Sequence, residues 1–135
     1  MQTAAQTVPA SKRKLWTGWI ISGLIVAFLL MDTAVKFLKP APVVETFVHL
    51  GIPISHANAL GVLCLLCVVV YAIPQTAVLG AVLLTGYLGG AVSTHWRVED
   101  PLFSHVLFPV YFGGLAWLGV YLREPRLRSL LPVRK

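Results

Sequence analysis

Ionisable and aromatic side chains that can bind a ligand gather at a few points of an otherwise apolar chain. Asp32 and Lys36 are four residues apart and would share one face of a helix. His95 opens the short polar stretch HWRVEDP and His105 follows it, so we expect these two histidines to approach each other across a short turn. Ionisable groups beside long apolar segments usually face a bundle interior or a wet cavity. We therefore predict a site that donates hydrogen bonds to a quinone carbonyl or an anionic head group. Its candidate residues are Asp32, Lys36, Tyr87, His95, Arg97, His105 and Tyr111.

The four histidines, His49, His56, His95 and His105, are predicted to lie on one side of the chain's apolar segments. No two of them have the H-x-x-H or H-x-x-x-H spacing with which one helix face holds a metal ion, so the sequence predicts no metal site. The alternative to a shared site is that the histidines are ordinary polar loop residues and do not lie close to one another.

Cys64 and Cys67 form a C-x-x-C motif (CLLC) inside an apolar segment. A redox C-x-x-C works best at a helix N-terminus, whereas apolar surroundings disfavour the reactive thiolate, so we expect two small packing residues. The alternative is a thiol–quinone oxidoreductase similar to the vitamin K epoxide reductases, which combine a four-helix core with an intramembrane C-x-x-C. That family relays electrons through a second cysteine pair, and this chain has only two cysteines.

The composition indicates that membrane helices position these residues. Of 135 residues 57% are hydrophobic and only 12% are charged, too few charges for a water-facing surface of this size. The mean hydropathy is +0.79, and no Asp, Glu, Lys or Arg occurs between Thr46 and Trp96. A net charge of +6 would suggest nucleic acid in a soluble protein, but the basic residues flank apolar segments and no nucleic-acid motif is present. The predicted partner is therefore the lipid bilayer.

The fold class predicted is all-α, a transmembrane four-helix bundle. A span needs about 20 residues, and prolines and glycines separate the apolar runs. A short amphipathic helix around 43–50 should lie in the interface of the first outer loop. Residues 1–14 are expected to be a disordered cytoplasmic tail, 15–122 the membrane domain and 123–135 a basic cytoplasmic tail. The predicted spans are 15–38, 57–73, 75–94 and 102–122.

Gly86 and Gly90 form a G-x-x-x-G pair in the third span. Lipid gives helices no hydrophobic reason to associate, so small residues that permit close backbone approach often mark a helix contact. We expect these two glycines to pack against another helix.

The basic residues predict the orientation. An even number of spans puts both termini on one side, and eight of the eleven basic residues belong to that side. The positive-inside rule then places both termini in the cytoplasm, with the chain in the plasma (inner) membrane.

The chain resembles the DoxX-like family of small four-helix membrane proteins over roughly residues 15–132. The resemblance rests on MDTAVKFLKPAPVVETF, LTGYLGGAVSTH, DPLF and LREPRLRSLLP, which occur in this order. The family takes its name from a subunit of an archaeal thiosulfate:quinone oxidoreductase, so the resemblance implies four spans and association with redox enzymes. Relatives carry a Glu in the second span where this chain has Cys64, so a role of that carboxylate would not carry over.

These patterns identify no catalytic residue. They favour an accessory or redox-associated membrane subunit that binds a quinone-like lipophile or a membrane oxidoreductase partner. The alternative is a non-catalytic assembly or packing protein, alone or as a homo-oligomer.

Overall fold

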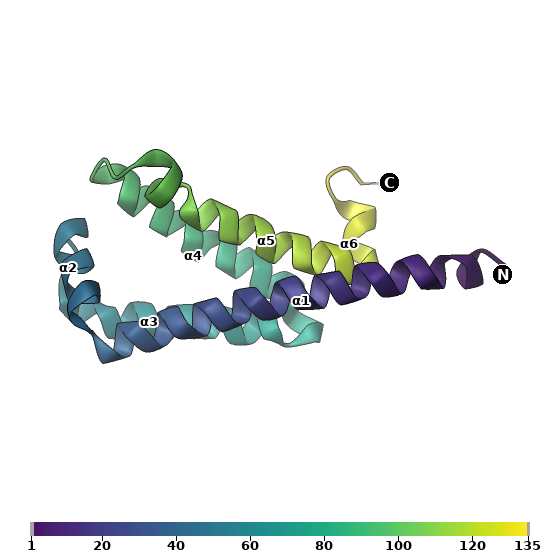
Figure 1. Cartoon of the computed structure of the whole chain (residues 1–135), viewed down its shortest axis with the longest axis horizontal. Helices are drawn as coiled ribbons and strands as arrows, with labels where there is room; N and C mark the ends of the chain where they lie inside the picture. The colour runs from purple at the N-terminus through teal and green to yellow at the C-terminus, as the bar shows by residue number, and fades with distance from the viewer. Residues whose placement is uncertain (1, 135) are drawn as a thin grey trace.

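The computed structural model describes residues 2–134, which form helices and turns and no strand (Figure 1). Short 3₁₀ turns precede α3 and α4, at Ile54–His56 and Pro74–Thr76, and a π-helical turn, Leu102–Val106, precedes α5. The α-helices are α1 (Gln2–Leu38), α2 (Ala41–Leu50), α3 (Ala57–Ala72), α4 (Ala77–Arg97), α5 (Phe108–Arg123) and α6 (Pro125–Leu130).

The four long helices pack in a ring in which α1 contacts α3 and α5, and α4 contacts the same two helices. The short helix α2 lies at one end of the bundle, while α6 and both chain termini lie at the other (Figure 1). We call these the α2 end and the terminal end. This is the four-helix bundle with one short extra helix that the sequence predicts.

The outside of the bundle is as apolar as its core. The structure has four helices long and apolar enough to cross a membrane, at Lys12–Leu38, Ile54–Ala72, Pro74–Arg97 and Leu102–Arg123. In none of them is more than 33% of the apolar window buried, so most apolar side chains face outward. A helix that is apolar all round needs an apolar environment on both sides. The chain is therefore an integral membrane protein.

Proline and glycine set the connections at the α2 end. Pro40 is the N-cap of α2, and Pro42 lies in its first turn, where a missing N–H costs nothing. Gly51 ends α2 in the left-handed conformation at φ 72°, and the Ile52 N–H then reaches back to the Phe47 carbonyl at 2.9 Å. The turn that leads into the second span therefore needs a glycine at this position.

The predicted spans agree with the observed helices to within a few residues, but the flanking segments differ. Helix α1 already begins at Gln2, so residues 2–14 continue the first span as helix. The disorder expected for 1–14 is not tested by this and stays a prediction. In the basic tail, α6 folds back so that Leu127 is buried against the core.

The fourth span is divided. A π-helical turn occupies Leu102–Val106, the chain bends at Leu107, and Pro109 then lies buried in the first turn of α5. A change of helix type therefore lies just before Pro109. Because a π turn is wider than an α turn, the side chains of this segment point in other directions than they would on a continuous α-helix.

The close helix contacts are made by other glycines than those predicted. Among the described residues, nothing lies within 4 Å of a Cβ built on Gly86 or Gly90, so the expected contact is not made within one chain. A Cβ on Gly80 would instead lie 2.2 Å from the Tyr71 Cα, and one on Gly119 would lie 2.5 Å from the Ser22 Oγ. The tight crossings are therefore α3 with α4 at Gly80, and α1 with α5 at Gly119.

A chain of hydrogen bonds crosses the core near the terminal end. The Arg123 Nε donates to the Ser22 Oγ at 3.1 Å, and the Ser22 Oγ lies 3.1 Å from the Tyr71 hydroxyl. Tyr71 in turn donates to the Ala116 carbonyl at 2.7 Å. Tyr71 is fully buried and Ser22 nearly so, and a buried polar group without a partner is costly, so this chain fixes α1, α3 and α5 together.

Candidate functional site

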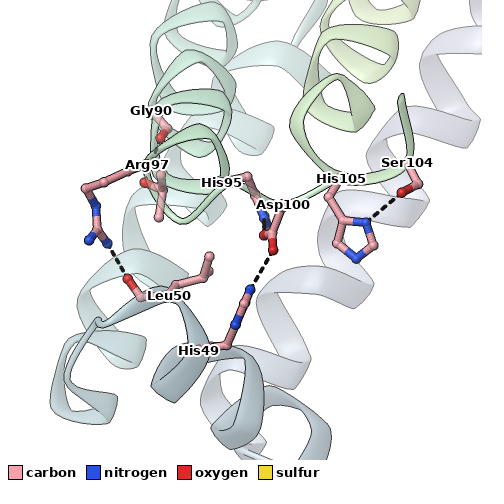
Figure 2. Close-up of polar contacts among 9 residues, drawn as sticks. His49, Leu50, Gly90, His95, Arg97, Asp100, Ser104 and His105 are labelled. Carbon is pink, nitrogen blue, oxygen red and sulfur yellow. Dashed lines mark hydrogen bonds and ion pairs between the residues drawn. The ribbon is translucent and has the colours of Figure 1, made fainter. Parts of the chain in front are cut away.

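An open pocket of about 370 Å³ lies at the α2 end, between α2 and the connection from α4 to α5. Figure 2 shows that three of its histidines come from three different segments: α2, the last turn of α4 and the π turn before α5. We call it the outer pocket. Its lining residues are Pro42, Glu45, Thr46, His49, His95, Asp100 and His105.

Asp100 joins two of these histidines. Its Oδ1 lies 2.5 Å from the His49 Nε2, and its Oδ2 lies 2.6 Å from the His95 Nδ1 (Figure 2). The side chain of Asp100 is only 7% exposed, whereas His95 is 21% and His49 55% exposed. The carboxylate therefore forms the inner wall of the pocket, and the imidazoles extend from it toward water.

The turn after α4 brings Asp100 back to His95. Glu99 has a left-handed backbone at φ 59°, and the Asp100 N–H donates to the His95 carbonyl at 3.2 Å. This reversal holds the Asp100 side chain over the last turn of α4 and opposite α2. The bond to His49 then ties α2 to the rest of the bundle.

The electrostatics of this bridge favour the carboxylate. Hydrogen bonds from His49 and then from His95 lower the pKa of Asp100 below its ordinary value. Asp100 is thus an anion throughout the physiological range and accepts from both rings. Each ring nitrogen that faces it is then a donor, which leaves Nδ1 of His49 and Nε2 of His95 as the acceptor nitrogens of neutral rings.

His105 lies beside this pair. Its ring centroid is 6.0 Å from that of His95, with the rings edge to face, and its Nδ1 lies 2.8 Å from the Ser104 Oγ. His95 and His105 therefore approach each other, as expected from the short turn between them. The exposed His105 ring is the member of the cluster that carries no carboxylate partner among the described residues.

Arg97 stabilises the pocket from outside. Its Nη2 donates to the carbonyl of Leu50 at the C-terminal end of α2, and its guanidinium covers Gly51 (Figure 2). A cation at a helix C-terminus interacts favourably with the helix dipole and with the unpaired carbonyls there. Arg97 thus holds α2 in place but does not line the pocket.

Two further predicted residues form a separate pair. Lys36 donates to Asp32 one turn away on α1, on the shared helix face that the sequence predicts. The Lys36 Cβ lies 3.4 Å from a Cβ built on Gly61 of α3. Both side chains are half-buried, and neither lines the outer pocket.

The two tyrosines also lie apart from the histidines. Tyr87 is partly buried and packs against the core cluster. Tyr111 donates to the Phe103 carbonyl at 3.0 Å, which satisfies a backbone acceptor of the π turn. Of the seven predicted site residues, His95 and His105 line the outer pocket and the other five do not.

Sequence reasoning missed five residues of the pocket: Pro42, Glu45, Thr46, His49 and Asp100. The signal available for two of them was that a histidine and an acidic residue both occur in outer segments. Their distance of 51 positions along the chain gave no reason to pair them. His56, the remaining outer histidine, does not line the pocket.

The cysteines are reduced and enclosed. Cys64 is fully buried and Cys67 is 4% exposed, and the Cys64 Sγ contacts the Leu29 carbonyl at 3.9 Å. Both belong to the core cluster, as expected for packing residues.

Among residues 2–134 no group of three or more His, Cys, Asp or Glu side chains is arranged to hold a metal ion. What the pocket offers instead is hydrogen bonding. The ring nitrogens of His49 and His95 that face away from Asp100 can accept from a hydroxyl, and His105 beside them can donate to a carbonyl.

Comparison with protein families gives one result. The model of the DoxX-like family matches residues 20–119, from the first span to the fourth. Comparison with curated proteins and with solved structures gives no match. Because the family model covers well over half of the chain and includes part or all of each of the four spans, the chain belongs to the DoxX-like family.

Proposed function

We propose that this protein is an accessory subunit that binds a quinone-like head group in the outer pocket and acts with a membrane oxidoreductase. The observation that supports this most is the bridge from His49 through Asp100 to His95, with His105 beside it. A quinone has two carbonyl oxygens that accept hydrogen bonds, and its reduced form has hydroxyls that donate them. His105 can donate to a quinone carbonyl through its Nε2 when its Nδ1 accepts from Ser104. The acceptor nitrogens of His49 and His95 can accept from the hydroxyls of the reduced form.

The size and position of the pocket suit such a ligand. Its volume of about 370 Å³ lies in the range of small-molecule sites. Leu102 and Phe103, next to the pocket in the chain, are 43% and 73% exposed and face the surroundings of the bundle. An isoprenoid tail would lie along these apolar side chains while the head group stays among the histidines.

Photolabelling tests this proposal. The protein in nanodiscs is illuminated with an azido-ubiquinone, and the labelled peptides are mapped by mass spectrometry with and without excess decylubiquinone. We expect competed labelling on α2 and on the Leu102–Val106 turn. His105→Ala should raise the concentration of decylubiquinone needed to suppress the labelling by about tenfold, the effect of losing one hydrogen bond to a bound ligand. Because His105 is exposed, this variant should still fold.

The matched control is His56→Ala, which removes an exposed histidine at the same end that does not line the pocket. Its binding should equal that of the parent protein. Equal competition in both variants, or labelling that excess quinone does not reduce, would contradict the proposal. The second function, a non-catalytic assembly protein, requires a folded bundle and a retained protein partner but no bound lipophile. Native mass spectrometry of the protein extracted with its own lipids distinguishes the two.

The proposed orientation places the outer pocket outside the cytoplasm, in the plasma (inner) membrane. Eight of the eleven basic residues of the sequence lie before the first span or after the fourth, and the positive-inside rule assigns that side to the cytoplasm. Reporter fusions after positions 75 and 135 should then read cytoplasmic, and a fusion near position 99 should read external. An external C-terminus would reverse this assignment.

A further inference from the structure

The terminal end of the bundle is strongly basic. Among its described residues it carries one acidic side chain, Glu124, whose Oε1 accepts a hydrogen bond at 3.2 Å from the Arg126 N–H at the start of α6. The described basic residues of this end are Lys12, Arg13, Lys14, Arg123, Arg126, Arg128 and Arg134. Charge alone would attract any anion, so the geometry of particular residues must show whether a defined site exists.

Arg123 is held in one position. Its guanidinium lies 4.3 Å above the centre of the Trp19 ring and 5.7 Å from that of Tyr71. Its Nε donates to the buried Ser22 Oγ at 3.1 Å. In the described part of the chain this is the one side-chain hydrogen bond of Arg123, which leaves the two amino groups of the guanidinium for an anion. A cation fixed in this way loses little side-chain freedom when it binds.

An apolar pocket of about 290 Å³ lies on the same surface, lined by Leu15, Trp16 and Trp19. Trp16 is 70% exposed and Trp19 42% exposed, although both side chains are large and apolar. Trp19 belongs to both features, since its ring lines the pocket and also makes the cation–π contact with Arg123. A cation and an apolar hollow are therefore adjacent, at the level where a span meets the head groups.

Helix α6 completes this surface. Leu127 is 5% exposed and packs on the core, so α6 lies across the end of the bundle. The Arg128 Nη1 donates to the carbonyls of Tyr121 and Leu122, both at 2.9 Å, and holds a second cation at the end of α5.

We propose that this surface binds one anionic phospholipid, with its phosphate on Arg123 and its glycerol and upper acyl chains against Trp16 and Trp19. Three observations support this ligand: the charge, the fixed guanidinium and the adjoining apolar pocket. Free phosphate would use only the first two, and a neutral lipid only the third. The proposal is independent of the outer pocket, which lies at the other end of the bundle.

Native mass spectrometry of the protein in detergent, titrated with phosphatidylglycerol or phosphatidylcholine, tests this. We expect a defined one-lipid complex with phosphatidylglycerol and much weaker binding of phosphatidylcholine. Arg123→Gln should lower phosphatidylglycerol affinity about fivefold, which corresponds to about 1 kcal/mol per basic residue at an anionic surface. The matched control, Arg126→Gln, removes the same charge from the same end without the tryptophan contact and should change affinity less than Arg123→Gln.

Trp16→Ala provides a second variant in case Arg123→Gln disturbs the core. Trp16 is exposed, so its loss should leave the fold intact while weakening phosphatidylglycerol binding. Three results would overturn the proposal: equal losses in Arg123→Gln and Arg126→Gln, unchanged binding in Trp16→Ala, or full competition by millimolar inorganic phosphate. The first would indicate diffuse attraction to a basic surface, and the last an anion site without a lipid.

Discussion

Replacing Gly80 by alanine should destabilise the bundle, because Gly80 lies where α4 crosses α3 most closely. A Cβ at this position would lie 2.2 Å from the Cα and 2.3 Å from the N of Tyr71. Ordinary contacts of a Cβ begin at 3.4 Å, so the two backbones would have to separate by about 1.2 Å. No side-chain rotation can relieve this clash, since both nearest atoms belong to the backbone.

The size of the effect follows from two opposing contributions. Overpacking a tight core costs about 1–3 kcal/mol, and a backbone clash belongs at the upper end of that range. Alanine gains about 1 kcal/mol over glycine inside a helix. The net loss should therefore be about 2 kcal/mol of unfolding free energy. Separation at this crossing would also disturb the Tyr71 hydrogen bonds to Ser22 and Ala116.

The assay is unfolding in mixed micelles with increasing sodium dodecyl sulfate, followed by circular dichroism. Gly86→Ala is the matched control, because it makes the same chemical change in the same helix where nothing lies within 4 Å of the new Cβ among the described residues. It should be as stable as the parent protein or slightly more so. If Gly80→Ala and Gly86→Ala unfold at the same detergent fraction, the close crossing of α3 and α4 is refuted.

Three further predictions concern the outer pocket and the cysteines. Asp100→Asn should lower stability at neutral pH. Because hydrogen bonds from His49 and His95 lower the pKa of Asp100, its contribution is fully present above the ordinary value of about 3.9 and is lost as pH falls through the lowered folded-state value. The unfolding free energies of parent and variant should therefore differ at pH 7, and the difference should shrink as the pH falls below about 3.9; a difference that stays constant with pH would argue against the bridge. Glu99→Gly should raise stability by about 1 kcal/mol in the same assay, since glycine adopts the left-handed backbone without the steric penalty of a Cβ. Replacing both Cys64 and Cys67 by alanine should leave quinone labelling unchanged, and both thiols should alkylate slowly in intact membranes because they are buried; loss of labelling at normal protein levels would instead support thiol–quinone chemistry.

The sequence alone was sufficient for the spans and their connections. Transfer of a helix into lipid depends on the sum over its own residues, so apolar runs of about 20 residues identify spans without any knowledge of neighbours. The ends of the helices also follow from local chemistry, as Pro40 and Gly51 illustrate on either side of α2. The approach of His95 to His105 was predictable for the same reason, because a short turn leaves little choice.

Only the tertiary structure decided which faces meet. In a soluble protein an apolar stripe marks the buried side of a helix. Here the core and the lipid are both apolar, so the helices are apolar on all sides and no stripe marks the buried face. The sequence therefore pointed to Gly86 and Gly90 as contact residues, whereas the close crossings occur at Gly80 and Gly119. The pairing of His49 with Asp100 was hidden in the same way, since it depends on how α2 packs against a turn 51 residues further along the chain.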